Sequence, residues 1–179
     1  MIRRLHWGCG PITPYGWVNS DIVANPGVEI VADIRQGLPV PSNAFDYAVS
    51  IHALPEISYS DLDRTLSELY RVLRPGGVLR LGLPDMDKAI RAYLARDVDY
   101  FFLIPDEHIS SLSGKMIVQL TWYGVSCSMF TLEFTAELLG RAGFRRMEEC
   151  SFRQTRSEFL GITELDNREL ESFFIEATK

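Results

Sequence analysis

The residues near the amino terminus place two glycines and a carboxylate at a spacing that suits ligand binding. Residues 5–7 favour a short buried strand, and Gly8-Cys9-Gly10 follows them directly. Glycine lets the backbone turn sharply and lets a ligand approach the main chain, because no Cβ intervenes. Asp21 ends a second strand-like run, residues 17–20. Since the carboxyl ends of neighbouring parallel strands border one crevice, this carboxylate can accept both hydroxyls of a ribose, and the pattern predicts a nucleoside-type ligand.

Length and composition bound the class of protein. The 179 residues carry a net charge of −6, with 46% hydrophobic and 23% charged residues, and we expect one domain over residues 1–179. An acidic chain argues against nucleic acid as a partner. The three cysteines form no C-x-x-C pair, so neither a disulfide framework nor a metal site is predicted. Without a signal-peptide pattern or a bilayer-spanning apolar run, we expect a cytoplasmic protein that binds no membrane.

Strand-like and helix-like patterns alternate along the chain, which favours an α/β sheet. Only ten residues separate Gly10 from Asp21. That is too short for a full crossover helix, so the first helix is expected to be vestigial. The expected strands are residues 5–7, 17–21, 28–32, 45–51, 78–83, 144–152 and 170–177, and the expected helices begin near residues 60, 86, 111 and 130, the second of them running to about 102.

Several segments resemble the class I S-adenosylmethionine-dependent methyltransferases, in particular the small methyltransferase type 11 group. The most specific of them is Arg71-Val72-Leu73-Arg74-Pro75-Gly76-Gly77. The resemblance covers nearly the whole chain. It implies a Rossmann-like α/β fold: a seven-stranded sheet of order 3-2-1-4-5-7-6 with an antiparallel last strand, in three α/β/α layers with a shortened first helix. The matching pieces are residues 5–10, 16–21, 31–33, 38–39, 45–46, 69–77, 83–85, 138–144 and 166–168.

The resemblance also implies S-adenosylmethionine as cofactor and a role for each matching position. The backbone of residues 8–10 would run along the amino acid part of the cofactor, and Asp21 would hold the ribose hydroxyls. Asp33 would accept a hydrogen bond from the adenine amino group, with Ile34 packed on the ring. Residues 50–52 would close the pocket from the other side. The predicted cofactor-binding residues are Gly8, Cys9, Gly10, Asp21, Ile22, Asp33, Ile34, Ile51 and His52.

Most of these positions also have a structural interpretation. Gly8-Cys9-Gly10 would be a plain turn after a strand, with Cys9 as a small buried filler. Asp33 would cap the segment that follows it, and His52 would be an ordinary loop histidine. Asp85 lies where a substrate could reach it, but an N-cap for the helix from residue 86 is the favoured interpretation. Trp122-Tyr123 form either one wall of a substrate pocket or part of the core.

No side chain is marked by the sequence as catalytic. His108 has the residue type of a general base, with an ordinary pKa near 6.5, and is the one candidate, although a surface histidine in an acidic loop is the favoured interpretation. The family commonly has His-x-Leu-Glu-His after the fourth strand, where this chain has His52-Ala53-Leu54-Pro55-Glu56. Methyl transfer mainly needs alignment of the reactants, plus a base where the nucleophile is protonated.

We therefore expect methyl transfer to a small-molecule acceptor, a saccharide or related metabolite, because relatives of this type accompany sugar and polysaccharide pathways. The alternative is a non-catalytic methyltransferase-fold module that binds a nucleoside ligand or a partner protein. A nicotinamide-dependent oxidoreductase is set aside, since Thr13 stands where the third glycine of Gly-x-Gly-x-x-Gly is needed. A homodimer stays open, as does the role of residues 105–129 as lid, pocket wall or dimer surface.

Overall fold

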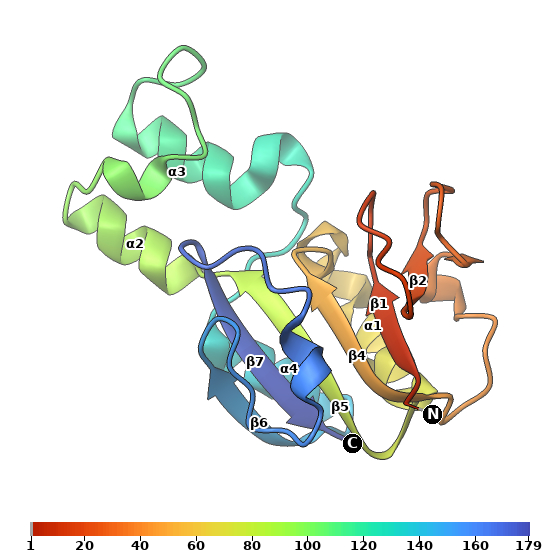
Figure 1. Ribbon diagram of the computed structural model, residues 1–179. Coiled ribbons are helices and arrows are strands. Elements are labelled where there is room, and N and C mark those ends of the chain that lie inside the picture. Colours follow the sequence, from red (N-terminus) through yellow and green to blue (C-terminus); the bar gives the residue numbers. More distant parts are fainter. Residues whose placement is uncertain (1) are drawn as a thin grey trace.

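The computed structural model describes residues 2–179, which form one seven-stranded sheet (Figure 1). The strand order is β3-β2-β1-β4-β5-β7-β6. Strand β7 is antiparallel to both of its neighbours, and the other pairs are parallel. This arrangement confirms the predicted fold class. The strands are β1 (Arg4–Trp7), β2 (Val18–Asp21), β3 (Ile30–Val31), β4 (Phe45–Ile51), β5 (Leu73–Pro84), β6 (Arg145–Cys150) and β7 (Ser172–Thr178).

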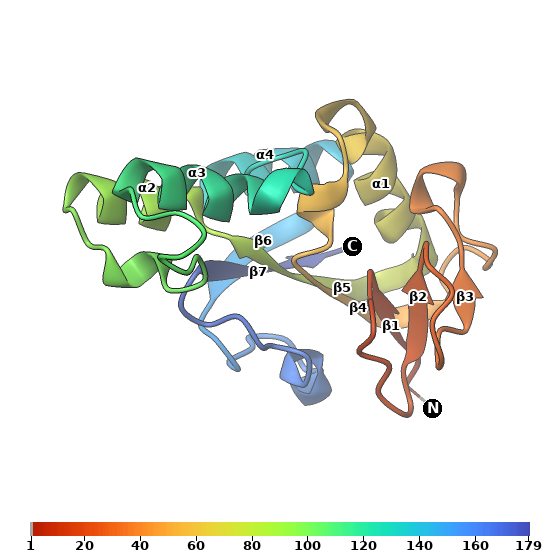
Figure 2. The same cartoon turned by 90° about the horizontal axis from the view of Figure 1, so that it is seen from above.

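All four α-helices of the described residues lie on one face of the sheet (Figure 2). The opposite face is covered by residues 151–171, so the third of the predicted α/β/α layers consists of loops and the short helix η5 (Leu160–Thr163), without an α-helix. Residues 8–17 connect β1 to β2 by turns. The first helix, which was expected to be vestigial, is absent from this segment. The helices are α1 (Tyr59–Val72), α2 (Met86–Leu94), α3 (Leu112–Thr121) and α4 (Leu132–Arg141).

Strand β4 connects the two cores of the molecule. Its side chains alternate between faces, so Ala48 packs in the core under the helices, whereas Tyr47 and Val49 pack with the η5 segment. Burial on both faces explains why residues 45–51 are an almost continuous apolar run, as in a central parallel strand. None of the helices in residues 2–179 is long and apolar enough to cross a bilayer.

Two predicted elements are shorter than expected. The predicted strand over residues 28–32 is only Ile30–Val31, because pairing with β2 is limited to the last two residues of that strand. The helix predicted from residue 86 to about 102 ends at Leu94. Arg96 adopts a left-handed conformation (φ 56°) that ends the helix in the manner of a C-terminal cap. The chain then makes a separate short turn, η3 (Asp99–Phe101).

Helix α1 begins one residue before the predicted residue 60. It ends at Val72, directly before strand β5. The cap residue is Ser58, whose hydroxyl donates to the Asp61 carboxylate, and the helix begins at Tyr59. Strand β5 begins directly after the helix, at Leu73 and not at the predicted residue 78, because Leu73 already pairs with Phe45. The remaining predicted strands and helices agree with the structure to within a few residues.

Candidate cofactor and acceptor site

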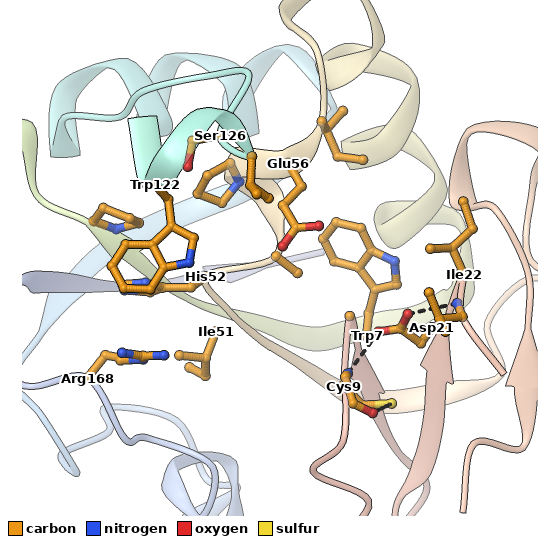
Figure 3. Close-up of a pocket in the computed structure, with 18 of the residues that line it drawn as sticks. Trp7, Cys9, Asp21, Ile22, Ile51, His52, Glu56, Trp122, Ser126 and Arg168 are labelled. Atoms are coloured by element: carbon orange, nitrogen blue, oxygen red, sulfur yellow. Dashed lines mark hydrogen bonds between the residues drawn. The ribbon is translucent and has the colours of Figure 1, made fainter. Parts of the chain in front are cut away.

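A pocket of about 540 Å³ lies at the carboxyl ends of β1, β2, β4 and β5 (Figure 3). Its volume falls within the range usual for small-molecule sites. We call the part around Gly8-Cys9-Gly10 and Asp21 the glycine half. The part around Trp122, which also contains residues of α2, α3 and the loop before β7, is the tryptophan half. Such a crevice at the strand ends is where open α/β sheets bind ligands.

The predicted cofactor-binding residues come together in this pocket. They derive from four separate segments of the chain, at the tips of β1, β2, β3 and β4, which the parallel sheet brings to one edge. Their contacts with individual parts of a cofactor remain predictions. The lining includes all nine of them: Gly8, Cys9, Gly10, Asp21, Ile22, Asp33, Ile34, Ile51 and His52.

The glycine turn exposes bare backbone to the pocket. The N–H groups of Gly8 and Cys9 both donate to the Ser20 carbonyl, at 2.8 and 3.1 Å. Gly8 has φ +67°, and a Cβ there would lie 2.1 Å from the Cβ of Ala53, so only glycine fits. Gly10 has φ +53° and open space around its Cα. Cys9 is a buried filler, because burial and the charge of Asp21 raise the pKa of its thiol to about 11.

The Asp21 carboxylate joins the glycine turn to the end of β2. Its Oδ2 accepts the Gly10 N–H over 2.8 Å, and its Oδ1 accepts the Val23 N–H over 2.9 Å. A carboxylate offers about four lone-pair positions, so each oxygen retains capacity for one ligand hydroxyl. The residue therefore fits the ribose-binding role and also has a structural role that the sequence did not indicate.

Asp33 caps a short helix, as its structural interpretation predicted. Its Oδ1 accepts from the backbone N–H of Arg35 over 3.0 Å and from the Arg35 Nε over 2.8 Å, at the start of η1 (Ile34–Gln36). The hydrogen bond from the Arg35 side chain holds the pKa of the Asp33 carboxyl below its usual range. Asp33 thus lines the pocket as an ionised acceptor beside the buried Ile34.

His52 lines the pocket directly after the end of β4. Its backbone is left-handed (φ 58°), and its Nε2 lies 2.7 Å from the Ser172 Oγ. Burial, with a smaller effect of the Arg168 charge, lowers the pKa of His52 to about 3. The ring is therefore neutral near pH 7 and is a poor general base.

The tryptophan half contains polar residues that no sequence pattern indicated. Arg168 Nη1 lies 3.6 Å from Oε1 of the buried Glu171. The hydroxyl of Tyr100 is buried and has no hydrogen-bond partner within residues 2–179. Burial and the charges of Asp85 and Glu171 raise its pKa. Trp122 forms part of the wall, as one of the two interpretations predicted, whereas Tyr123 is exposed and is not among the lining residues.

Two further sequence-based candidates are clarified by the geometry. Asp85 is the N-cap of α2, since its Oδ1 accepts the Lys88 N–H over 3.0 Å, and it also lines the pocket. His108 is not among the lining residues. It is exposed, with its Nδ1 3.2 Å from the Tyr123 hydroxyl. The geometry therefore favours the surface interpretation of His108, and we do not propose it as a base.

The methyltransferase domain family model matches residues 18–81, from β2 into β5. The strand order of the structure is also the one that the resemblance implied. Over residues 18–81 the chain is similar to the methyltransferase domain family, in agreement with the resemblance predicted from the sequence.

Curated proteins similar to this chain include the ubiquinone/menaquinone biosynthesis C-methyltransferase UbiE of Escherichia coli. It is 33% identical over 90 residues, which are 49% of this chain and 33% of that protein. The match therefore spans about a third of the length of these curated relatives.

Solved structures share the fold over almost the whole chain. A possible histamine N-methyltransferase from Thermotoga maritima is 19% identical with a TM-score of 0.63, covering 99% of this chain and 82% of that one. The Burkholderia thailandensis 1,6-didemethyltoxoflavin-N1-methyltransferase is 15% identical with a TM-score of 0.57, covering 98% and 70%. That structure contains 1,6-didemethyltoxoflavin and S-adenosylhomocysteine, the demethylated form of the cofactor.

Proposed function

We propose that this domain binds S-adenosylmethionine in the glycine half and transfers its methyl group to a small molecule in the tryptophan half. The observation that carries the proposal is the Asp21 carboxylate at the tip of β2, which accepts the Gly10 N–H in a turn with two glycines. The two halves form one continuous pocket, so a ligand in the first can face a ligand in the second.

The glycine half suits each part of the cofactor. The main chain of Gly8-Cys9-Gly10 passes along its amino acid part without a Cβ in the way. The Asp21 carboxylate accepts the ribose hydroxyls, as a bidentate acceptor can. The ionised Asp33 accepts from the adenine amino group, and the Ile34 side chain packs on the ring. These assignments are supported by the presence of all four segments in one pocket.

The cofactor supplies an activated methyl group on a sulfonium. The protein therefore has to align the acceptor, exclude water, and accept a proton where the nucleophile carries one. Glu171 is a buried carboxylate in the tryptophan half and Asp85 is a second one. These two, and not the neutral His52, are the proton acceptors that the half offers.

We extend the proposal to a hydroxylated acceptor, such as a saccharide or related metabolite. The Arg168 guanidinium can donate and the Glu171 carboxylate can accept hydrogen bonds in the same half, and a hydroxyl group can pair with either. The Trp122 indole provides an apolar wall beside them.

The test is transfer of label from methyl-labelled S-adenosylmethionine to a panel of acceptors. The panel includes free and nucleotide-linked sugars, aromatic amines and quinols, and S-adenosylhomocysteine is quantified in each reaction. We expect acceptor-dependent label and an equal amount of S-adenosylhomocysteine. A protein that binds the cofactor but labels no acceptor would instead support the non-catalytic module.

A further inference from the structure

Glu56 is a pocket residue that the predicted cofactor set does not include. It is the last residue of η2 (Leu54–Glu56), the short helix that follows β4. Figure 3 shows its carboxylate directed into the cavity, between Trp7 in the glycine half and Trp122 in the tryptophan half. Glu56 therefore lies at the junction of the two halves.

The Glu56 carboxylate has no compensating group among residues 2–179. Its side chain makes no hydrogen bond or ion pair within the part of the chain that the structure describes. Partial burial and the negative charge of Asp21 raise the pKa of Glu56. The other carboxylates of the pocket each have a backbone N–H or an arginine as partner, and they are Asp21, Asp33, Asp85 and Glu171.

Glu56 is exposed to solvent within the pocket, and a ligand that fills the pocket would exclude water from its carboxylate. An unpaired carboxylate favours a cation beside it, because opposite charges attract more strongly as water is excluded. Under the proposed function, on which this inference rests, one positive charge of the ligand must face this junction. The sulfonium lies between the amino acid part and the ribose, and its methyl group has to point towards the tryptophan half. A sulfonium bound in this way would therefore lie at the junction of the two halves, where the Glu56 carboxylate also lies.

We propose that Glu56 recognises the sulfonium charge and makes the domain bind S-adenosylmethionine more tightly than S-adenosylhomocysteine. The two ligands differ by one methyl group and by the charge on sulfur, which is positive in the first and neutral in the second. A carboxylate facing the sulfur stabilises only the charged form. Product release is favoured for the same reason, since methyl transfer removes the charge that Glu56 attracts.

The experiment is calorimetric titration of the full chain with each ligand, for the wild type, Glu56→Gln and Glu133→Gln. Glu133 is exposed on α4 outside the pocket and carries the same change in net charge. We expect the ratio of the Kd for S-adenosylhomocysteine to the Kd for S-adenosylmethionine to fall about fivefold in Glu56→Gln, which corresponds to about 1 kcal/mol. Glu133→Gln is expected to keep the wild-type ratio. Glu56→Lys is expected to lower the ratio further.

Other outcomes separate the alternatives. Equal weakening of both ligands in Glu56→Gln would assign Glu56 to the α-ammonium, which both ligands share, and would overturn the proposal. An unchanged ratio would overturn it as well, while leaving the cofactor site intact. A wild type that binds neither ligand would overturn the proposed function and this inference with it. Raising the salt concentration on the wild type provides a test without substitution, because screening must weaken S-adenosylmethionine more than S-adenosylhomocysteine.

Discussion

The Gly10 backbone N–H donates to the Asp21 Oδ2 over 2.8 Å, and this bond ties the tip of β1 to the tip of β2. The two residues are the features from which the sequence-based prediction of a nucleoside-type ligand starts. In the structure one carboxylate both orders the glycine turn and faces the pocket. Ligand binding and local order at this edge of the sheet therefore depend on the same side chain.

Replacing Asp21 by alanine is expected to weaken the binding of S-adenosylhomocysteine at least tenfold. The variant loses one or two hydrogen bonds to a charged group, each worth about 1.5–3 kcal/mol. Equilibrium dialysis with labelled ligand measures the change. Asp87→Ala is the matched control, because Asp87 is exposed on α2 and does not line the pocket. Wild-type affinity in Asp21→Ala would mean that the ribose is held elsewhere.

The Gly8→Ala substitution is expected to destabilise the fold more than Gly10→Ala. Both positions have positive φ, and a left-handed alanine costs roughly 1–2 kcal/mol. At Gly8 the new Cβ also lies 2.1 Å from the Ala53 Cβ, whereas at Gly10 nothing lies within 4 Å. Urea unfolding compares the two variants. Adding Ala53→Gly should restore part of the stability of Gly8→Ala, and equal losses at the two glycines would contradict the close approach.

His52 should make the protein less stable in mild acid. Its folded-state pKa of about 3 lies below the ordinary value of 6.5. Between these values the unfolded chain binds the extra proton, so stability is fully present above about pH 6.5 and falls as the pH drops, by at most about 1.4 kcal/mol per pH unit. His52→Asn removes this group and tolerates the left-handed backbone.

Urea unfolding of the wild type and His52→Asn at several pH values between 7 and 4 tests this expectation. The stability of the variant relative to the wild type should increase steadily as the pH falls. His108→Asn is the matched control, because His108 is exposed and lies outside the pocket. Parallel stability curves for the wild type and His52→Asn would show that His52 is accessible to protons in the folded state.

The buried arginine of β5 should be a major source of stability. Arg80 is 0% exposed and bonds Asp166 Oδ1 over 2.9 Å and Glu176 Oε1 over 2.7 Å. Arg80→Met would leave two buried carboxylates without their partner, and such a loss costs about 3–5 kcal/mol. Arg141→Met removes a surface pair with Asp63 and should change little. Similar unfolding midpoints for the two variants would contradict the role of Arg80.

Elements buried on both faces could be predicted closely from the sequence. The limits of β4, residues 45–51, are those expected, because most of its residues are apolar and all but the last are buried. The limits of β3 and α2 could not be predicted in the same way. They depend on how far β2 extends beside β3 and on the left-handed backbone at Arg96, and neither is visible in a local pattern.

The two halves of the pocket also differ in how far their residues could be predicted from the sequence. The predicted residues of the glycine half directly follow strands, so their place in the sequence also gives their place at the sheet edge. Tyr100, Trp122, Arg168 and Glu171 come from loops and helices whose packing alone brings them together. Glu56 had a signal in the sequence, since it stands at the last position of the family's His-x-Leu-Glu-His pattern, but its direction into the pocket needed the structure.

A crystal structure of the protein with S-adenosylhomocysteine tests the central claim most directly. The account predicts that both ribose hydroxyls lie at hydrogen-bond distance, about 2.5–3.0 Å, from the Asp21 carboxylate, with the adenine beside Ile34 and the sulfur facing Glu56. A ligand bound outside this pocket would contradict the claim. So would a ligand in the pocket whose ribose does not touch Asp21.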